Sequence, residues 1–272
     1  MRLKITHTTE YRYDEPVQYT LQRLRLTPLS GPSQDVINWD IAVDGAVIEA
    51  GYNDHFGNHV HLVSTEGDSH TVRIVASGTL ETLDRTGVYG PHTGYCPLWL
   101  FLRDTPQTRA GKLTRELVRK LTDDNELARM HALMGLLHEQ VAFIPGTSTT
   151  ETTAEQALEE KSGVCQDHAH IFIAAARSLG IPARYVSGYL MMDGNEQQTA
   201  THAWAEAHLP GLGWVGFDPA NDMCPDDHYV RTATGLSYAD AAPISGMRIG
   251  IAGEDLTVSV VVENQSQSQS QS

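Results

Sequence analysis

Apolar and polar residues alternate with a period of two along the first third of the chain. The alternating apolar residues are Leu3, Ile5, Tyr11, Tyr13, Leu24 and Leu26. Three β-branched runs follow at 37–43, 59–63 and 71–76, bounded by Gly, Asp and Asn. Several short strands at this spacing are typical of an antiparallel sandwich or a small barrel. The pattern therefore predicts a sandwich-like β domain over residues 1–84.

Helical periodicity replaces this alternation after a connector at 86–106 that is rich in Gly and Pro. Two apolar stripes follow at spacings of three and four residues. Their members are Leu113, Leu117 and Leu121, and then Leu127, Met130, Met134, Leu137 and Val141. Together, the β-rich and helical parts predict an α+β protein. We assign residues 85–264 to a second domain, with the connector and helices in 85–145 and a core in 146–264.

A short helix and a longer one meet around Cys165. Thr153 and Gln156 have the spacing of a capping box, which predicts a helix over 154–161. Gly163 stands where a helix stop belongs. Apolar residues then recur at three and four up to Gly180. Cys165 is therefore expected in the first turn of a buried helix, where the free N–H groups and the helix dipole stabilise an anion.

Two alternating runs predict an antiparallel hairpin at 201–209 and 214–218, because turn-forming residues separate them. A three-residue loop, Leu209 to Gly211, would place Asp218 opposite His202. A five-residue loop, Leu209 to Gly213, would place it opposite Trp204, on the same face and diagonal to His202. Two or four residues would send Asp218 to the other face. The sequence leaves the first two registers open, and a carboxylate can reach the imidazole in either.

Cys165, His202 and Asp218 are the residue types of a nucleophile, its base and the group that orients the base. A cysteine at a helix start is more often a packed small residue, but the expected hairpin favours the catalytic interpretation. Gln166 and the indoles of Trp204 and Trp214 are weaker candidates, for oxyanion binding and for a substrate wall.

No metal ligand set is expected. Cys165 and His168 share a helix face that His170 does not, so the three do not suit zinc. His55, His59 and His61 flank a turn and have no known ligand spacing.

Three motifs resemble those of the transglutaminase-like superfamily. They are Ser162-Gly163-Val164-Cys165, Thr201-His202-Ala203-Trp204 and Trp214-Val215-Gly216-Phe217-Asp218-Pro219. The chain is most similar to bacterial members that carry an N-terminal β domain and to which a cysteine protease activity is ascribed; a segment from Arg231 to Gly246 resembles them too. The resemblance implies a papain-like core. Animal cross-linking enzymes have Trp after the cysteine where this chain has Gln166, which weakens any inference of cross-linking or calcium activation.

Composition narrows the functional classes. The chain has 272 residues and a net charge of −15, so it repels nucleic acid. No apolar run has the length of a signal peptide or a membrane span, and three cysteines do not make a disulfide framework. We expect a cytoplasmic protein without a cofactor that acts on a peptide or protein substrate, not on nucleic acid or a membrane. A polar tail at 265–272 is expected to be disordered.

Three hypotheses remain from the sequence. The first is a cysteine peptidase or amidase that forms an acyl-enzyme. The second is a protein-glutamine acyltransferase, or transglutaminase, with the same three residues. The third is a non-catalytic binding module that retains the fold.

Overall fold

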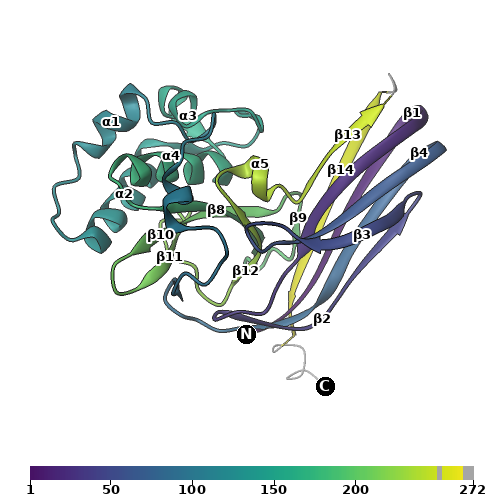
Figure 1. Cartoon of the computed structure of the whole chain (residues 1–272), viewed down its shortest axis with the longest axis horizontal. Coiled ribbons are helices and arrows are strands. Elements are labelled where there is room, and N and C mark those ends of the chain that lie inside the picture. Colours follow the sequence, from purple (N-terminus) through teal and green to yellow (C-terminus); the bar gives the residue numbers. More distant parts are fainter. Residues whose placement is uncertain (250–252, 266–272) are drawn as a thin grey trace.

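A computed structural model describes residues 1–249 and 253–265 of the chain, with the backbone alone at 66–68. Nearly all of the expected polar tail lies outside these residues. Two antiparallel sheets lie side by side, and helices cover one of them (Figure 1). This arrangement confirms the predicted α+β class. Within the described residues, no helix is both long and apolar enough to cross a bilayer.

The larger sheet has seven strands. They are β1 (Arg2–Thr27), β2 (Gln34–Asp44), β3 (Val47–Asn53), β4 (His59–Thr82), β9 (Gln197–Gln198), β13 (Ile244–Ile249) and β14 (Glu254–Asn264). Their order is β2-β4-β1-β14-β9, with β3 also paired to β4 and β13 to β1. Register shifts between Arg12 and Tyr19 divide β1 into two parts. Both parts contribute to one apolar core, in which Tyr11 and Ile74 cluster with Leu24 and Val63, so the sheet is sandwich-like as expected.

The strands of this sheet do not all come from the N-terminal third of the chain. The first half of β1 pairs with β4 on one side and with β14 on the other, and its second half pairs with β13. The expected domain of residues 1–84 therefore gains three strands, β9, β13 and β14, which lie within the residues 146–264 that were expected to form the core. The pattern within β13 and β14 carries no sign of which sheet they join, because that depends on a partner more than 200 residues away.

The smaller sheet holds the residues of interest. Its strands are β12 (Tyr229–Gly235), β8 (Ala183–Leu190), β10 (His202–Leu209), β11 (Gly213–Phe217) and β5 (Val88–Gly90), in that order. The connector expected at 86–106 is not purely a loop, since it supplies β5 and a 3₁₀ helix at Leu98–Leu102. β5 forms because β11 would otherwise leave its outer edge unpaired.

Helix α4 (Cys165–Ser178) packs across this sheet and is buried along almost its whole length. Small side chains explain the close packing: Ala174 and Ala176 on the helix share a core with Ala203, Ala205 and Ala207 of β10. Three other helices surround it, namely α1 (Lys112–Val118), α2 (Glu126–Gln140) and α3 (Ala154–Glu160). The capping box of Thr153 and Gln156 is present at α3, as expected. The remaining short elements are β6 (Ala142–Phe143), β7 (Ser162–Gly163) and α5 (Tyr238–Ala241).

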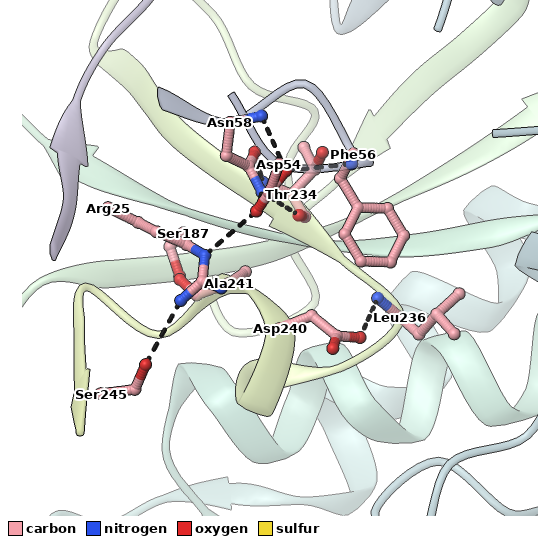
Figure 2. Close-up of polar contacts among 10 residues, drawn as sticks. All are labelled: Arg25, Asp54, Phe56, Asn58, Ser187, Thr234, Leu236, Asp240, Ala241 and Ser245. Atoms are coloured by element: carbon pink, nitrogen blue, oxygen red, sulfur yellow. Dashed lines mark hydrogen bonds and ion pairs between the residues drawn. The ribbon is translucent and has the colours of Figure 1, made fainter. Parts of the chain in front are cut away.

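The two sheets are joined by an apolar layer and by a polar clamp. Leu3, Ile5 and Leu80 of the large sheet pack against Tyr189 and Val230 of the small one. Figure 2 shows the clamp, in the loop between β3 and β4.

Asn58 is the centre of this clamp. Its amide accepts from the N–H of Thr234 and donates to the carbonyl of the same residue, both at 2.8 Å. Asp54 accepts from Asn58 and from Arg25, so the loop is held from both sides (Figure 2). A loop of the large sheet is thereby fixed to β12 of the small sheet.

We expect Asn58→Ala to destabilise the protein by about 1–3 kcal/mol, because it leaves buried backbone groups of Thr234 without partners. Urea unfolding measures the change. Asn53→Ala, at the end of β3 and exposed, is the matched control and should stay within about 0.5 kcal/mol of the wild type. Equal losses in the two variants would contradict the role given to Asn58.

Candidate active site

Cys165 is the first residue of α4, and Asp167 fixes the turn that leads into it. Oδ2 of Asp167 accepts the N–H of Val164 at 2.8 Å and the hydroxyl of Ser148 at 2.5 Å. Gly163 leaves the room for this: a Cβ there would lie 2.7 Å from the Cβ of Asp167. The role of Gly163 is therefore to let the backbone pass close to the side chain of Asp167. The residue that stops α3 is Lys161, in the left-handed region at φ 53°, and the assignment of the helix stop to Gly163 was wrong.

His168 packs beneath the start of the helix and does not point to a metal site. Its two ring nitrogens lie 2.9 Å from the carbonyl oxygens of Val164 and Val141. The second contact ties α4 to the end of α2. The parallel pairing of β6 with β7 joins the same two segments, namely the residues after α2 and the residues before α4.

The β10–β11 hairpin adopts the second of the two expected registers. Leu209 pairs with Gly213 and Ala205 with Phe217, so Asp218 falls level with Trp204, one residue beyond the end of β11. From this diagonal position its Oδ2 lies 2.6 Å from Nε2 of His202. The two side chains are almost completely buried.

Three further groups hold Asp218 in place. Its Oδ2 accepts from Asn221 at 2.7 Å and from the hydroxyl of Tyr229 at 2.8 Å, and its Oδ1 accepts from the N–H of Ala220 at 3.1 Å. Burial raises the pKa of Asp218, but the hydrogen bonds from His202, Asn221 and Tyr229, together with the charge of His202, outweigh it and leave the pKa below its usual value. The group is therefore a carboxylate.

Sequence reasoning missed both side chains that support this carboxylate. Asn221 had a signal, because it follows Asp218 by three residues in a turn-forming Asp-Pro-Ala-Asn segment. Tyr229 had none, since it reaches Asp218 from β12, across the sheet.

The imidazole of His202 interacts with both Asp218 and Cys165. Burial lowers its pKa, but the charge of Cys165 and hydrogen bonds with Asp218 and Cys165 outweigh this effect and raise the pKa to about 10. Because Asp218 occupies Nε2, Nδ1 is the nitrogen left for the thiol. The structure thus brings together all three residues that the sequence singled out.

The three weaker candidates lie in different places. Trp204 is adjacent to His202, with ring centroids 6.2 Å apart, but it is buried against Tyr229. Gln166 is also largely buried, and its amide donates to the carbonyl of Thr149 at 3.4 Å. Trp214 is remote: it pairs with His208, six residues along β10 from His202, which corresponds to about 20 Å.

A cavity of about 220 Å³ lies beside Thr201, the residue before His202. Its walls come from both parts of the molecule. The large sheet supplies His7, Thr9 and Tyr11 of β1, and the core supplies Thr201 and Tyr238. Tyr238 packs against the same core as Cys165. The N-terminal strands therefore border a space that reaches Thr201, the neighbour of His202 in the chain.

Possible metal ligands are scarce in the part of the chain that is described. Only Asp226, Asp227 and His228 place three ligand atoms within 4.8 Å of one another there. This group is half-buried, and Asp227 pairs with the N-terminal amine at 3.5 Å. His59 already contacts Asn53 through Nδ1 at 2.9 Å.

The raised pKa of His202 makes stability depend on pH. A folded pKa of about 10, above an unfolded value of 6.5, means that the protonated imidazole stabilises the fold fully below pH 6.5. This contribution is lost as the pH rises to about 10. We expect the free energy of unfolding, measured in urea, to fall over that range in the wild type and in His208→Gln, and to fall much less in His202→Gln. Parallel curves for all three proteins would refute the assignment.

Comparison with known proteins agrees with the fold and the motifs. A profile of the "Transglutaminase-like superfamily" matches residues 111–219, and one of the "Bacterial transglutaminase-like N-terminal region" matches residues 3–81. The "Uncharacterized protein ML0607" of Mycobacterium leprae is 27% identical over 286 residues, covering 96% of this chain and 98% of its own length. A "Protein-glutamine gamma-glutamyltransferase" of Pseudomonas aeruginosa is 30% identical over 175 residues, which is 58% of this chain but 25% of that protein.

A solved structure extends the likeness to nearly the whole chain. It is that of "a Putative Cysteine Protease from Cytophaga hutchinsonii", with a TM-score of 0.76 and 26% identity, and it covers 97% of this chain and 91% of that one. The two profiles fall on the two parts of the fold described above. The chain belongs to the transglutaminase-like superfamily, in the bacterial form that carries the N-terminal β region.

Proposed function

We propose that this protein is a cysteine peptidase or amidase that works through an acyl-enzyme, with Cys165 as the nucleophile. The observation that carries the proposal is the position of His202, whose imidazole interacts with the Cys165 thiol and with the Asp218 carboxylate. An imidazole placed between a thiol and a buried carboxylate is the arrangement that nucleophilic catalysis requires.

The proposed reaction follows from this geometry. His202 takes the thiol proton through Nδ1, and Asp218 stabilises the resulting imidazolium. The thiolate attacks the amide carbon, and the C–N bond breaks as His202 donates its proton to the leaving amine. Water, deprotonated by His202, then attacks the thioester and releases the acid and the thiol. The first backbone N–H groups of α4 have no partner within the helix and can stabilise the oxyanion formed in each step.

The substrate we propose is a peptide or protein. The cavity beside Thr201 offers a substrate side chain a place one residue along the chain from His202, and its apolar and hydroxyl-bearing walls suit an uncharged group. Burial lowers the pKa of His7 in this wall to about 4, so it stays neutral.

All three cysteines are free thiols, which supports the cytoplasm as the location.

An acyltransferase is the alternative, in which an amine and not water accepts the acyl group. The Pseudomonas aeruginosa transferase supports it, but only over a quarter of that protein's length. The Cytophaga hutchinsonii structure supports a protease and covers 97% of this chain. We therefore place hydrolysis first.

Alkylation with iodoacetamide at pH 6 should modify Cys165 alone. Burial raises the pKa of Cys96, and it raises that of Cys224 to about 11, so these two thiols stay protonated. An ordinary thiol is ionised to less than about 1% at this pH. His202→Ala should therefore slow the reaction of Cys165 by about a hundredfold, as measured by mass spectrometry, whereas His208→Ala should leave the rate unchanged. Equal labelling of all three cysteines would favour the non-catalytic binding module.

Incubation with a glutamine-containing peptide and a labelled primary amine separates the two chemistries. We expect release of ammonia or cleavage of the peptide, without incorporation of the label, and no reaction with Cys165→Ala. Asp218→Asn should lower the turnover number by about a hundredfold or more, because the imidazolium loses its carboxylate. Incorporation of the label as the main product would replace the hydrolase with the transferase.

A further inference from the structure

A second buried polar cluster lies on the face of β10 that carries His202, nearer the other end of the strand. Glu206 accepts from Arg184 of β8 at 2.6 Å and from Arg231 of β12 at 3.2 Å. Glu206 is 3% exposed, and the side chains of the two arginines are 10% and 13% exposed. Two buried guanidinium groups therefore share one carboxylate, which leaves one positive charge without a partner in the cluster.

Aromatic rings hold both guanidinium groups in fixed orientations. The Arg184 guanidinium carbon lies 4.0 Å from the ring centroid of Trp214, and that of Arg231 lies 3.8 Å from the ring centroid of Tyr89. Stacking of this kind fixes the plane of the group and its donors. The two guanidinium groups are therefore already oriented to bind a planar partner.

A cavity of about 220 Å³ opens onto these arginines. Its lining includes Arg184, Arg231, Tyr89 and Trp214, and among the described residues it includes no Asp or Glu. Glu206 lies outside the lining. The cavity therefore has two cationic groups in its wall and no anionic one, and the single carboxylate that pairs with them does not line it.

His92, which also lines the cavity, adds no charge. The indole N–H of Trp214 can only donate, and it does so to Nδ1 of His92 at 3.1 Å. Nε2 of His92 must then carry the proton, which it donates to the carbonyl of Cys96 at 2.5 Å. A neutral imidazole leaves the arginines as the source of the positive potential.

The opposite wall comes from the loop between β3 and β4. Phe56 and Asn58 of this loop line the cavity, and Figure 2 shows how the contacts of Asn58 with Thr234 and Asp54 hold it in place. The cavity is thus lined both by strands of the small sheet and by this loop of the large one. It is separate from the cavity beside Thr201, with which it shares no lining residue.

We propose that this cavity binds a small ligand through a carboxylate group. A carboxylate carries the single negative charge that balances the cluster, and its planar shape matches the donor fork of arginine. The rings of Phe56, Tyr89 and Trp214 would contact the apolar part of such a ligand. Burial lowers the pKa of Arg184 to about 10, whereas Glu206 and Tyr89 outweigh burial at Arg231 and raise its pKa, so both guanidinium groups are charged at neutral pH.

Benzoate is a suitable probe, with benzamide as its uncharged counterpart and inorganic phosphate as a different anion. Their affinities for the full chain can be measured at constant ionic strength by the shift in melting temperature and by saturation-transfer NMR of the ligand. We expect saturable binding of benzoate, and at least tenfold weaker binding of benzamide and of phosphate. Arg231→Gln should weaken benzoate binding at least tenfold.

Thr93 provides a pair of variants that leaves the buried cluster intact. It is exposed and lines the cavity. Thr93→Glu places a carboxylate at the rim and should compete with benzoate, weakening it at least tenfold, whereas Thr93→Gln should bind as the wild type does. Benzoate binding that Arg231→Gln and Thr93→Glu leave unchanged would overturn the proposal, as would equal binding of benzamide or tighter binding of phosphate.

Discussion

The candidate active site depends on one hydrogen bond, between Nε2 of His202 and Oδ2 of Asp218. Both groups are buried, where an unpaired charge would be costly, and each one compensates for the burial of the other. The bond exists because the register of the β10–β11 hairpin places Asp218 level with Trp204, which keeps the side chains of Asp218 and His202 on one face of the sheet. A shift of the register by one residue would separate them.

Much of this arrangement follows from local features of the sequence. The capping box at Thr153, the apolar spacing after Cys165 and the alternation around His202 each predict an element that the structure contains. The hairpin could be narrowed to two registers but not to one, because the turn-forming residues do not decide whether Gly213 lies opposite Ala207 or opposite Leu209. The α+β class follows from the change of period along the chain.

What the sequence could not reveal depends on contacts between distant segments. Tyr229 reaches Asp218 across the sheet, and β5 forms only because the edge of β11 is available. Trp214 shares the face of His202 in the alternating pattern, yet it lies at the far end of the hairpin. A pattern of period two identifies a face of a strand and not a position along it. One face of β10 therefore carries both the candidate active site and the arginine cluster around Glu206.

The pairing of β14 with the first half of β1 has a consequence for the order of folding. During synthesis, residues 3–13 have β4 on one side from an early stage, while their other side must wait until residues 254–264 have left the ribosome. Until then the nascent chain presents an open strand edge, to which another chain could add. The large sheet is therefore completed after the small one: a chain cut short before residue 254 encodes every strand of the small sheet but lacks β14 of the large one.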